Sequence, residues 1–203
     1  PETQSFYMMF IRTDIFEEMG LKAPATWDEL DRIIPDLQKM NMTVGIPHDL
    51  NALLMFMYQR KAPLYLEDGA RTNLDSKVAI QCFQKLTEYF TLYNLPTDFD
   101  FYNRFRSGEM PIAIQDYTVY NQLSLFAPEI RGDWAMMSVP GTVDENGKIN
   151  NTTTAKATAV MMLRGAEDPE SAWEFMKWWT SAETQSDFTI QMQATLNSAM
   201  QAT

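Results

Sequence analysis

Residues 104–141 read RFRSGEMPIAIQDYTVYNQLSLFAPEIRGDWAMMSVPG, and this stretch decides the expected fold. Residues 112–114 are apolar, branched and too few for a helix, which is typical of a buried strand. Asp116 is a candidate N-cap for a helix over residues 117–126, and a second apolar run follows at residues 134–139. Two strands joined by a helix predict a β-α-β unit, in which groups at strand ends commonly meet a ligand.

Two further apolar runs extend this unit into a small sheet. Residues 6–11 are rich in Phe, Tyr, Met and Ile, and residues 43–46 form a shorter run; both are predicted to be strands. Thr26 and Glu29 form a capping box, which predicts a helix beginning at Trp27. Strands that alternate with helices in this way predict an α/β fold with a mostly buried sheet.

The other elements are predicted from apolar periodicity and from residues that commonly cap helices or make turns. They are a short helix after Thr13 or Asp14, a kink or break at Pro35, a buried helix over 50–60, a long helix from Asp75, a helix after Asp98, a hairpin turn at 144–147, a strand over 158–163, a Trp-rich helix that Asp168 caps before Pro169, and a last helix over 183–200.

Composition excludes several classes of function. The chain has 203 residues, 45% of them apolar, which favours a packed globular structure over disorder. Its 16 basic and 27 acidic residues give a formal charge of −11, which repels phosphate backbones, so we expect no nucleic-acid partner. No run approaches the ~18 apolar residues that a membrane helix needs, and the amino-terminal sequence does not resemble a signal peptide.

Few residues are available for metal or nucleophilic chemistry. Cys82 is the only cysteine, which excludes an internal disulfide and a cysteine-rich metal site. His48 is the only histidine, so a catalytic triad or a histidine-based zinc site has almost no ligands to draw on. We therefore expect neither a metal nor a cofactor.

Three stretches resemble one protein family. They are 105–110 with 112–114, 127–129 and 139–141; 13–21 with 24–30; and 172–178. In this order they resemble the extracellular solute-binding proteins of bacterial ABC importers, in the sugar-type branch (family 1, maltose-binding-protein-like). The chain departs from the family pattern at Asp116-Tyr117-Thr118, where many members carry Gly, a small residue and Trp.

The resemblance implies a periplasmic-binding-protein-like lobe of class II, with a small mixed sheet flanked by helices. Residues 1–154 would form the second, ligand-binding lobe of a two-lobed protein, and residues 155–203 a strand and helices that return to the other lobe. An amino-terminal lobe, with any export signal, would precede this chain, and the natural chain would continue past Thr203. The location implied is the extracellular or periplasmic face of a bacterial membrane.

The resemblance also implies ligand contacts for polar and aromatic residues that directly follow predicted strands. A polyol site needs aromatic faces for C–H surfaces and polar groups for hydroxyls, which Asp116 and Tyr117 would supply; as structural residues they would instead cap a helix and pack locally. His48 and Asp49 follow the 43–46 strand where the family commonly places contacts. The remaining candidates match other family contact regions: Phe99, Asn151 and Thr152. Local packing and turn formation are their structural alternatives.

Aromatic residues at helical spacing, Trp173, Phe175, Met176, Trp178 and Trp179, predict a helix packed into a core. In particular, we expect Trp173, Trp178 and Trp179 to pack on the last helix, on the remaining lobe or on a second copy of the chain, because exposing a tryptophan costs on the order of 2 kcal/mol. An exposed patch on a protein-interaction domain is the alternative.

The expected function is capture of a small-molecule solute, an oligosaccharide or sugar, without chemistry. The expected protein partners are ABC permease subunits in the membrane, and self-association of the fragment is also open. An alternative from another class is a glycoside hydrolase, which needs two carboxylates across a cleft and a raised pKa on one of them. The acidic residues mostly fall at predicted helix starts, which argues against the enzyme.

Overall fold

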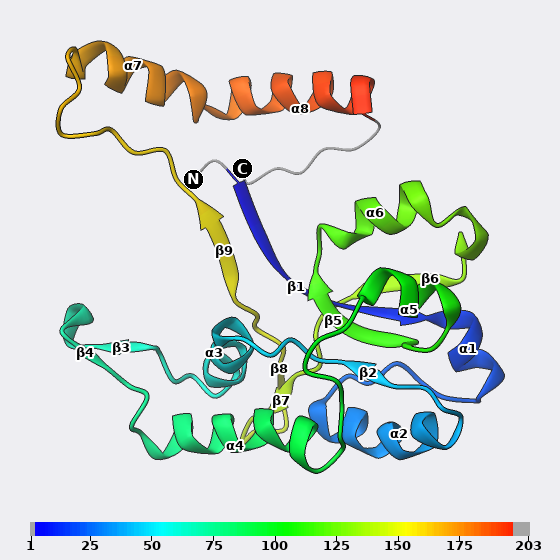
Figure 1. Cartoon of the computed structure of the whole chain (residues 1–203). Coiled ribbons are helices and arrows are strands. Elements are labelled where there is room, and N and C mark those ends of the chain that lie inside the picture. The colour runs from blue at the N-terminus through cyan, green and yellow to red at the C-terminus, as the bar shows by residue number, and fades with distance from the viewer. Residues whose placement is uncertain (1–2, 197–203) are drawn as a thin grey trace. The chain divides into compact units, whose positions relative to one another are not determined.

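A computed structural model describes residues 3–196 of the chain, and Figure 1 shows their elements. By contacts between Cα atoms the chain divides into two compact units. The first unit, here called the body, is Tyr7–Thr154. The second, here called the terminal unit, combines the described parts of Pro1–Phe6 and Ala155–Thr203.

A mixed sheet forms the centre of the body. Its strands lie in the order β2-β5-β1-β6, with bounds β2 (Val44–Gly45), β5 (Ile112–Asp116), β1 (Thr3–Arg12, of which the body holds the part from Tyr7) and β6 (Trp134–Met137). β2 is parallel to β5, and β1 is antiparallel to both β5 and β6. Strands β2, β5 and β6 therefore run in one direction, and their carboxyl ends lie at one edge of the sheet.

The predicted α/β class is confirmed, and the β-α-β unit has an added feature. β5 and β6 are parallel and joined by a helix as expected, but β1 lies between them and pairs with both. The runs predicted as strands are all confirmed: 43–46 and 134–139 contain β2 and β6, whereas 6–11 and 112–115 lie within the longer β1 and β5.

The sheet is apolar on both faces, and successive residues of β1 and β5 face opposite sides. Met9, Ile11 and Ile114 belong to one cluster of buried residues, whereas Phe10 and Ala113 belong to the other. Because both faces are covered, the strands read as continuous apolar runs rather than as alternating ones. That is why short stretches of this sequence predicted strands well.

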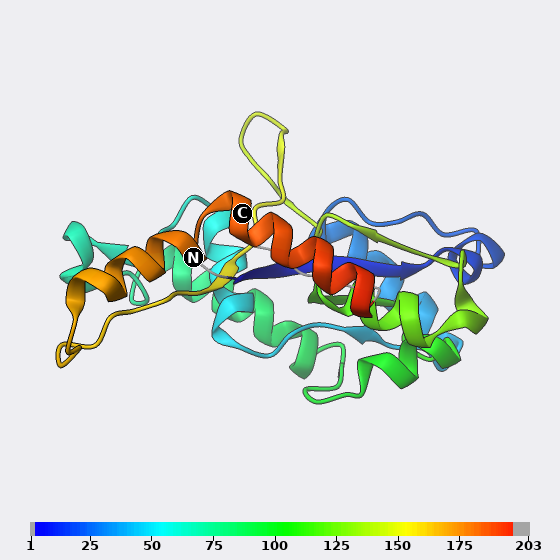
Figure 2. The ribbon, with the colours of Figure 1, turned by 90° about the horizontal axis from the view of Figure 1, so that it is seen from above.

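Six α-helices accompany the sheet within the body: α1 (Thr13–Glu18), α2 (Trp27–Lys39), α3 (Leu50–Gln59), α4 (Lys77–Thr91), α5 (Phe101–Ser107) and α6 (Val119–Phe126). Buried residues of α2, α3 and α4 join the larger apolar cluster, whereas those of α5 and α6 join the smaller one. Figure 2 shows the same ribbon from above. Cys82 is fully buried in α4, and burial raises the pKa of its thiol.

The start of α2 confirms the capping box. The Thr26 hydroxyl accepts a hydrogen bond from the Glu29 N–H at 3.2 Å, and the Glu29 carboxylate accepts one from the Thr26 N–H at 3.3 Å. The helix continues through Pro35 as one element, so the predicted break there is absent.

Four predicted helix caps are wrong by one or two residues. α1 begins after Arg12 without a side-chain cap, and α6 begins after Thr118, also without one. Ser76 and Asp100 cap α4 and α5, in place of the predicted Asp75 and Asp98. The reason is local competition among neighbouring polar residues: Asp75 pairs with Arg71, and Asp116 stays in β5.

Short elements complete the body: β3 (Tyr65–Leu66), η1 (Glu67–Gly69), β4 (Arg71–Thr72), η2 (Pro128–Ile130), β7 (Thr142–Val143) and β8 (Ile149–Asn150). β7 and β8 form the predicted hairpin. The Asp144 carboxylate accepts hydrogen bonds from the N–H groups of Lys148 and Asn146, both at 2.9 Å, which lowers the pKa of Asp144. Gly147 has φ +77°, which the turn requires and which glycine adopts without strain.

The terminal unit contains an antiparallel pair and two helices: the first residues of β1 with β9 (Ala155–Thr158), then α7 (Pro169–Trp179) and α8 (Ala182–Leu196). Asp168 caps α7 as predicted, accepting a hydrogen bond from the Ser171 N–H at 3.0 Å. The predicted last helix is α8, although residues 197–200 of that prediction lie outside the described residues.

Two expectations for the terminal unit are wrong. Residues 159–163 are not a strand: β9 ends at Thr158, and Met161 and Leu163 are exposed. The Trp-rich helix is not in a core either, because no residue of α7 is buried. The expected packing on the last helix is confirmed for Trp179, whose ring lies 5.5 Å from that of Phe188 in α8, whereas Trp173 and Trp178 are exposed.

Candidate functional site

The candidate site lies where the parallel strands β2 and β5 end. His48 and Asp49 follow β2, whereas Asp116 closes β5 and Tyr117 comes next. Because β2 and β5 are parallel neighbours, both pairs of residues follow strands at the same edge of the sheet. Sequence position after an apolar run was the signal that selected them.

Tyr7, which sequence reasoning missed, links two of these candidates. Its hydroxyl donates a hydrogen bond to Asp49 Oδ2 at 2.7 Å, and in the strand register Tyr7 is the partner of Asp116. Burial, the bond to Asp49 and the negative charges of Asp49 and Asp116 raise the pKa of Tyr7 well above its ordinary value. The Tyr7 phenol and two aspartates therefore lie together. Tyr7 is the one hydroxyl-bearing aromatic residue in the apolar run 6–11, and that feature could have marked it as a candidate site residue.

Asp49 has a structural role and keeps room for a ligand. Its Oδ1 accepts a hydrogen bond from the Ala52 N–H at 2.9 Å, so Asp49 is the N-cap of α3. Each carboxylate oxygen can accept more than one hydrogen bond, and Asp49 is exposed. The residue can therefore hold the helix, hold Tyr7 and still accept a hydrogen bond from a hydroxyl.

Tyr117 presents a half-buried ring beside this cluster. Burial and the charge of Asp116 raise the pKa of the Tyr117 hydroxyl, so the neutral phenol is favoured. A neutral phenol both donates and accepts, and its ring offers an apolar face.

His48 and Phe99 are held by aromatic or core contacts. The exposed His48 ring lies 4.8 Å from the ring of Phe90 in α4. Phe99 is partly buried against the smaller apolar cluster, and a Cβ atom added to Gly45 in β2 would lie 3.0 Å from Phe99 Cε2. Phe99 therefore packs closely over the β2 backbone, and with Ala113 Cβ and Met110 Sδ, both 2.7 Å from the added Cβ atom, it leaves room only for glycine.

Asn151 and Thr152 are exposed and follow β8. The Thr152 hydroxyl donates to Asn150 Oδ1 at 2.7 Å, and the Thr152 carbonyl accepts from Gln59 Nε2 at 3.2 Å. The backbone here is thus fixed while the side chain of Asn151 projects from it.

Gln59 is the second residue that sequence reasoning missed. It is 3% exposed at the end of the otherwise apolar α3. Its Oε1 accepts from Trp27 Nε1 at 2.7 Å and from the Thr142 hydroxyl at 3.0 Å, and its Nε2 donates to the Pro140 carbonyl at 3.0 Å. This one amide therefore connects α2 and α3 to the segment that leads to Thr152.

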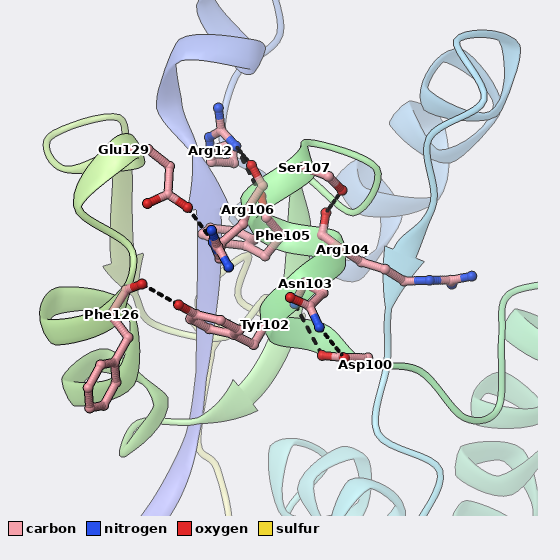
Figure 3. A network of polar contacts seen from close by, with 10 residues as sticks. All are labelled: Arg12, Asp100, Tyr102, Asn103, Arg104, Phe105, Arg106, Ser107, Phe126 and Glu129. Atoms are coloured by element: carbon pink, nitrogen blue, oxygen red, sulfur yellow. Dashed lines mark hydrogen bonds and ion pairs between the residues drawn. The ribbon is translucent and has the colours of Figure 1, made fainter.

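A polar network fixes the position of α6, the helix that follows Tyr117 (Figure 3). The Tyr102 hydroxyl donates to the Phe126 carbonyl at the end of α6, and the Arg106 guanidinium pairs with Glu129. Arg106 also lies over the Tyr102 ring, with Cζ 5.0 Å from its centroid.

The network extends from α5, and Arg12 binds the carboxyl-terminal end of that helix (Figure 3). Its Nη1 donates to the carbonyls of Phe105 and Arg106 at 3.0 and 3.1 Å. These carbonyls belong to the last turn of α5, where that of Phe105 also accepts from the N–H of the C-cap residue Gly108 at 3.2 Å. A buried cation at this end is also favoured by the helix dipole.

The described carboxyl groups with a lowered pKa all lie outside the strand edge and serve local structure: Asp14, Asp100, Glu129, Asp144 and Asp168. Among the described residues no group of three or more His, Cys, Asp or Glu side chains could hold a metal ion. No described helix is long and apolar enough to cross a bilayer.

A family model described as bacterial extracellular solute-binding protein matches residues 1–201. The chain belongs to this family. Its description is that of binding proteins and not of enzymes, so the glycoside hydrolase alternative is wrong. Membership places this solute-binding protein outside the cytoplasmic membrane, in the periplasm or beyond it.

Solved structures share the fold of this solute-binding chain. A putative oligosaccharide periplasmic-binding protein from Synechococcus sp. MITs9220 has a TM-score of 0.72 and 16% identity, over 95% of this chain and 49% of that one. A solute-binding protein from Thermotoga lettingae TMO bound with alpha-D-tagatose has a TM-score of 0.69 and 18% identity, over 99% and 53%. The sugar-binding protein MalE from Xanthomonas citri has a TM-score of 0.68 and 15% identity, over 93% and 49%.

These likenesses support the fold and leave the ligand open. The identities are low, and the chain spans about half the length of the solved structures it matches. No curated protein matches the chain in sequence.

Proposed function

We propose that this chain captures a carbohydrate-like solute for an ABC importer and holds it at the carboxyl edge of the sheet without changing it chemically. The observation that carries the proposal is the arrangement of Tyr7, Asp49 and Asp116 at that edge. Membership of the solute-binding family supports binding as the activity.

The edge has the groups that a sugar requires. Sugar hydroxyls donate hydrogen bonds, and the carboxylates of Asp49 and Asp116 accept strong ones. Tyr117 offers a ring face for sugar C–H groups, and His48 and Asn151 are exposed polar groups that we assign to the rim. Relatives with the same fold include proteins solved with alpha-D-tagatose and with maltotetraose, which favours a carbohydrate here.

We also propose how the chain is used in its natural protein. Residues 1–154 act as one lobe and residues 155–203 belong with an opposite lobe, so that the solute is enclosed between the two. The loaded protein then docks on permease subunits in the membrane. Phe99 and Thr152 support the site through the backbone segments that they fix.

Isothermal titration of the natural full-length protein with a panel of mono- and oligosaccharides tests the proposal. We expect one of the sugars to bind, and Tyr117→Ala to weaken its binding by about 1 to 3 kcal/mol. Asp116→Asn should weaken it by a similar amount, because a charge-assisted hydrogen bond becomes a neutral one.

Tyr65→Ala is the matched control, since Tyr65 lies in β3, remote in sequence from the edge residues, and is 58% exposed. It should leave the affinity unchanged. A folded Tyr117→Ala variant that binds every sugar as tightly as the unmodified protein would remove Tyr117 from the site. Absence of binding to every sugar in the panel would overturn the carbohydrate assignment.

A further inference from the structure

A cavity of about 510 Å³ lies between α6 and β6, apart from the strand edge described above. It is lined by Tyr120 and Ser124 of α6, by Arg131 and Gly132 of the loop, and by Trp134 and Met136 of β6, among others. This volume lies within the range of small-molecule sites in proteins. We call it the α6–β6 groove.

The groove is separate from the candidate solute site. Trp134 pairs with Arg12 in the strand register, whereas Asp116 pairs with Tyr7. Tyr7 and Arg12 are five residues apart on β1, a separation of roughly 17 Å along an extended strand. None of Tyr7, Asp49, Asp116 and Tyr117 lines the groove, although the backbone N–H of Tyr120 in its lining donates to the Tyr117 carbonyl at 3.0 Å.

Two aromatic rings form an apolar wall of the groove. Tyr120 and Trp134 meet edge to face, with ring centroids 5.3 Å apart and planes at 68°. Trp134 is held from behind by the fully buried Phe10, at 6.0 Å between centroids. Tyr120 remains 46% exposed, so a rigid aromatic pair is open to solvent on one side. Such surfaces take the C–H face of a ring-shaped molecule.

The polar groups of the lining are hydrogen-bond donors. The Arg131 guanidinium and the Trp134 indole N–H can only donate, whereas the hydroxyls of Tyr120 and Ser124 can do both. Within residues 3–196, the Arg131 side chain has no ion pair or hydrogen bond, in contrast to the side chain of Arg106, which Glu129 neutralises. No carboxylate lines the groove.

We propose that the α6–β6 groove is a second binding site, which takes a carboxylate-bearing monosaccharide such as a hexuronate. The sugar ring lies against Tyr120 and Trp134, and its carboxylate accepts two parallel hydrogen bonds from Arg131. The strand edge has hydrogen-bond acceptors around Tyr7 and therefore favours ligands whose hydroxyl groups donate. The groove has hydrogen-bond donors and therefore favours a ligand with a carboxylate.

Titration of the ¹⁵N-labelled chain, followed by NMR at the Trp134 indole N–H, tests this site directly. D-glucuronate should shift that signal at millimolar concentration, D-glucose should require at least tenfold more, and acetate should not shift it. The three probes separate the contributions of the ring and of the charge. We expect such small ligands to bind in the roughly millimolar range. The proposal is overturned if glucuronate and glucose shift the signal equally. It is also overturned if glucuronate causes no shift at concentrations about 50-fold above that range.

Variants distinguish this site from the proposed solute site. Arg131→Gln should lower the affinity for glucuronate about tenfold and leave the response to glucose unchanged, because only the charged hydrogen bonds are lost. Tyr120→Ala should weaken both sugars. Tyr117→Ala should leave the Trp134 titration unchanged, since Tyr117 does not line the groove. If Tyr117→Ala abolishes the shift while Arg131→Gln does not, the sugar binds at the strand edge and the groove is not a site.

Discussion

Trp27 in the body and Trp173 and Trp178 in the terminal unit differ sharply in exposure. In the body, Trp27 is 3% exposed, its ring lies 4.4 Å from Phe56, and its N–H donates to Gln59. In the terminal unit, Trp173 and Trp178 are 53% and 56% exposed. Both kinds sit on amphipathic helices, so the helical pattern alone does not decide burial. What decides it is whether other elements of the same unit cover the apolar face.

The largest expected effect is on the buried tryptophan. Trp27→Ala should lower the free energy of unfolding by about 3–5 kcal/mol, because it leaves a cavity and removes a buried hydrogen bond. Trp173→Ala is the matched control and should change it by less than about 0.5 kcal/mol. Urea unfolding followed by circular dichroism measures both. Similar losses in the two variants would mean that Trp173 is buried in solution and that the two units do not differ in this respect.

A smaller loss of stability is expected on removing the buried hydrogen bonds of Gln59 in the body. Gln59→Met keeps the side-chain volume but leaves the Trp27 N–H and the Pro140 and Thr152 carbonyls without their partner. We expect a loss of about 1–3 kcal/mol in unfolding free energy. Gln38→Met, at an exposed position in α2, should cost much less. A neutral Gln59→Met would show that water or backbone shifts replace these bonds.

The smallest expected effects are on the pH dependence of stability, and they arise from one aspartate in each unit. The hydrogen bond from Arg12 lowers the pKa of Asp14 in the body, and bonds from Ser171 lower that of Asp168 in the terminal unit. A carboxyl group with a lowered folded pKa stabilises the fold above its unfolded value of about 3.9, and this stabilisation is lost as the pH falls through the folded pKa.

For Asp14 the contribution is below about 1 kcal/mol, because the group is partly exposed. Asp14→Asn should therefore lower the urea midpoint at pH 6 and have no effect at pH 2. Asp168→Asn should change the pH dependence of helix content in α7 and leave the urea midpoint of the body unaltered. A midpoint difference for Asp14→Asn that persists unchanged at pH 2 would exclude ionisation as its cause.

The sequence predicted the elements that local physics specifies. The strands at 112–115 and 6–11 are apolar because both faces of the sheet are covered, and Thr26 with Glu29 is a local hydrogen-bonding pattern. The strand over 158–163 was wrong because strand formation depends on a partner that lies elsewhere in the chain. The predicted burial of the Trp-rich helix was wrong for a similar reason, because the periodicity of a helix does not show which other elements cover its apolar face.

The candidate site was predictable only in part. Position after an apolar run selected Asp49 and Asp116, which Tyr7 brings together. The roles of Tyr7 and Gln59 depend on pairings between residues 32 to 109 positions apart, such as Gln59 with Trp27 and Tyr7 with Asp116. No local pattern encodes such distances.

The four-way bonding of Gln59 also constrains how this sequence can change over generations. A replacement at position 59 leaves groups from Trp27, Pro140, Thr142 and Thr152 unsatisfied at once. These groups belong to different segments, so a single substitution at 59 weakens four contacts together, and no one second substitution restores them all. In a random library of variants, position 59 should therefore accept fewer replacements than the exposed position of Gln38.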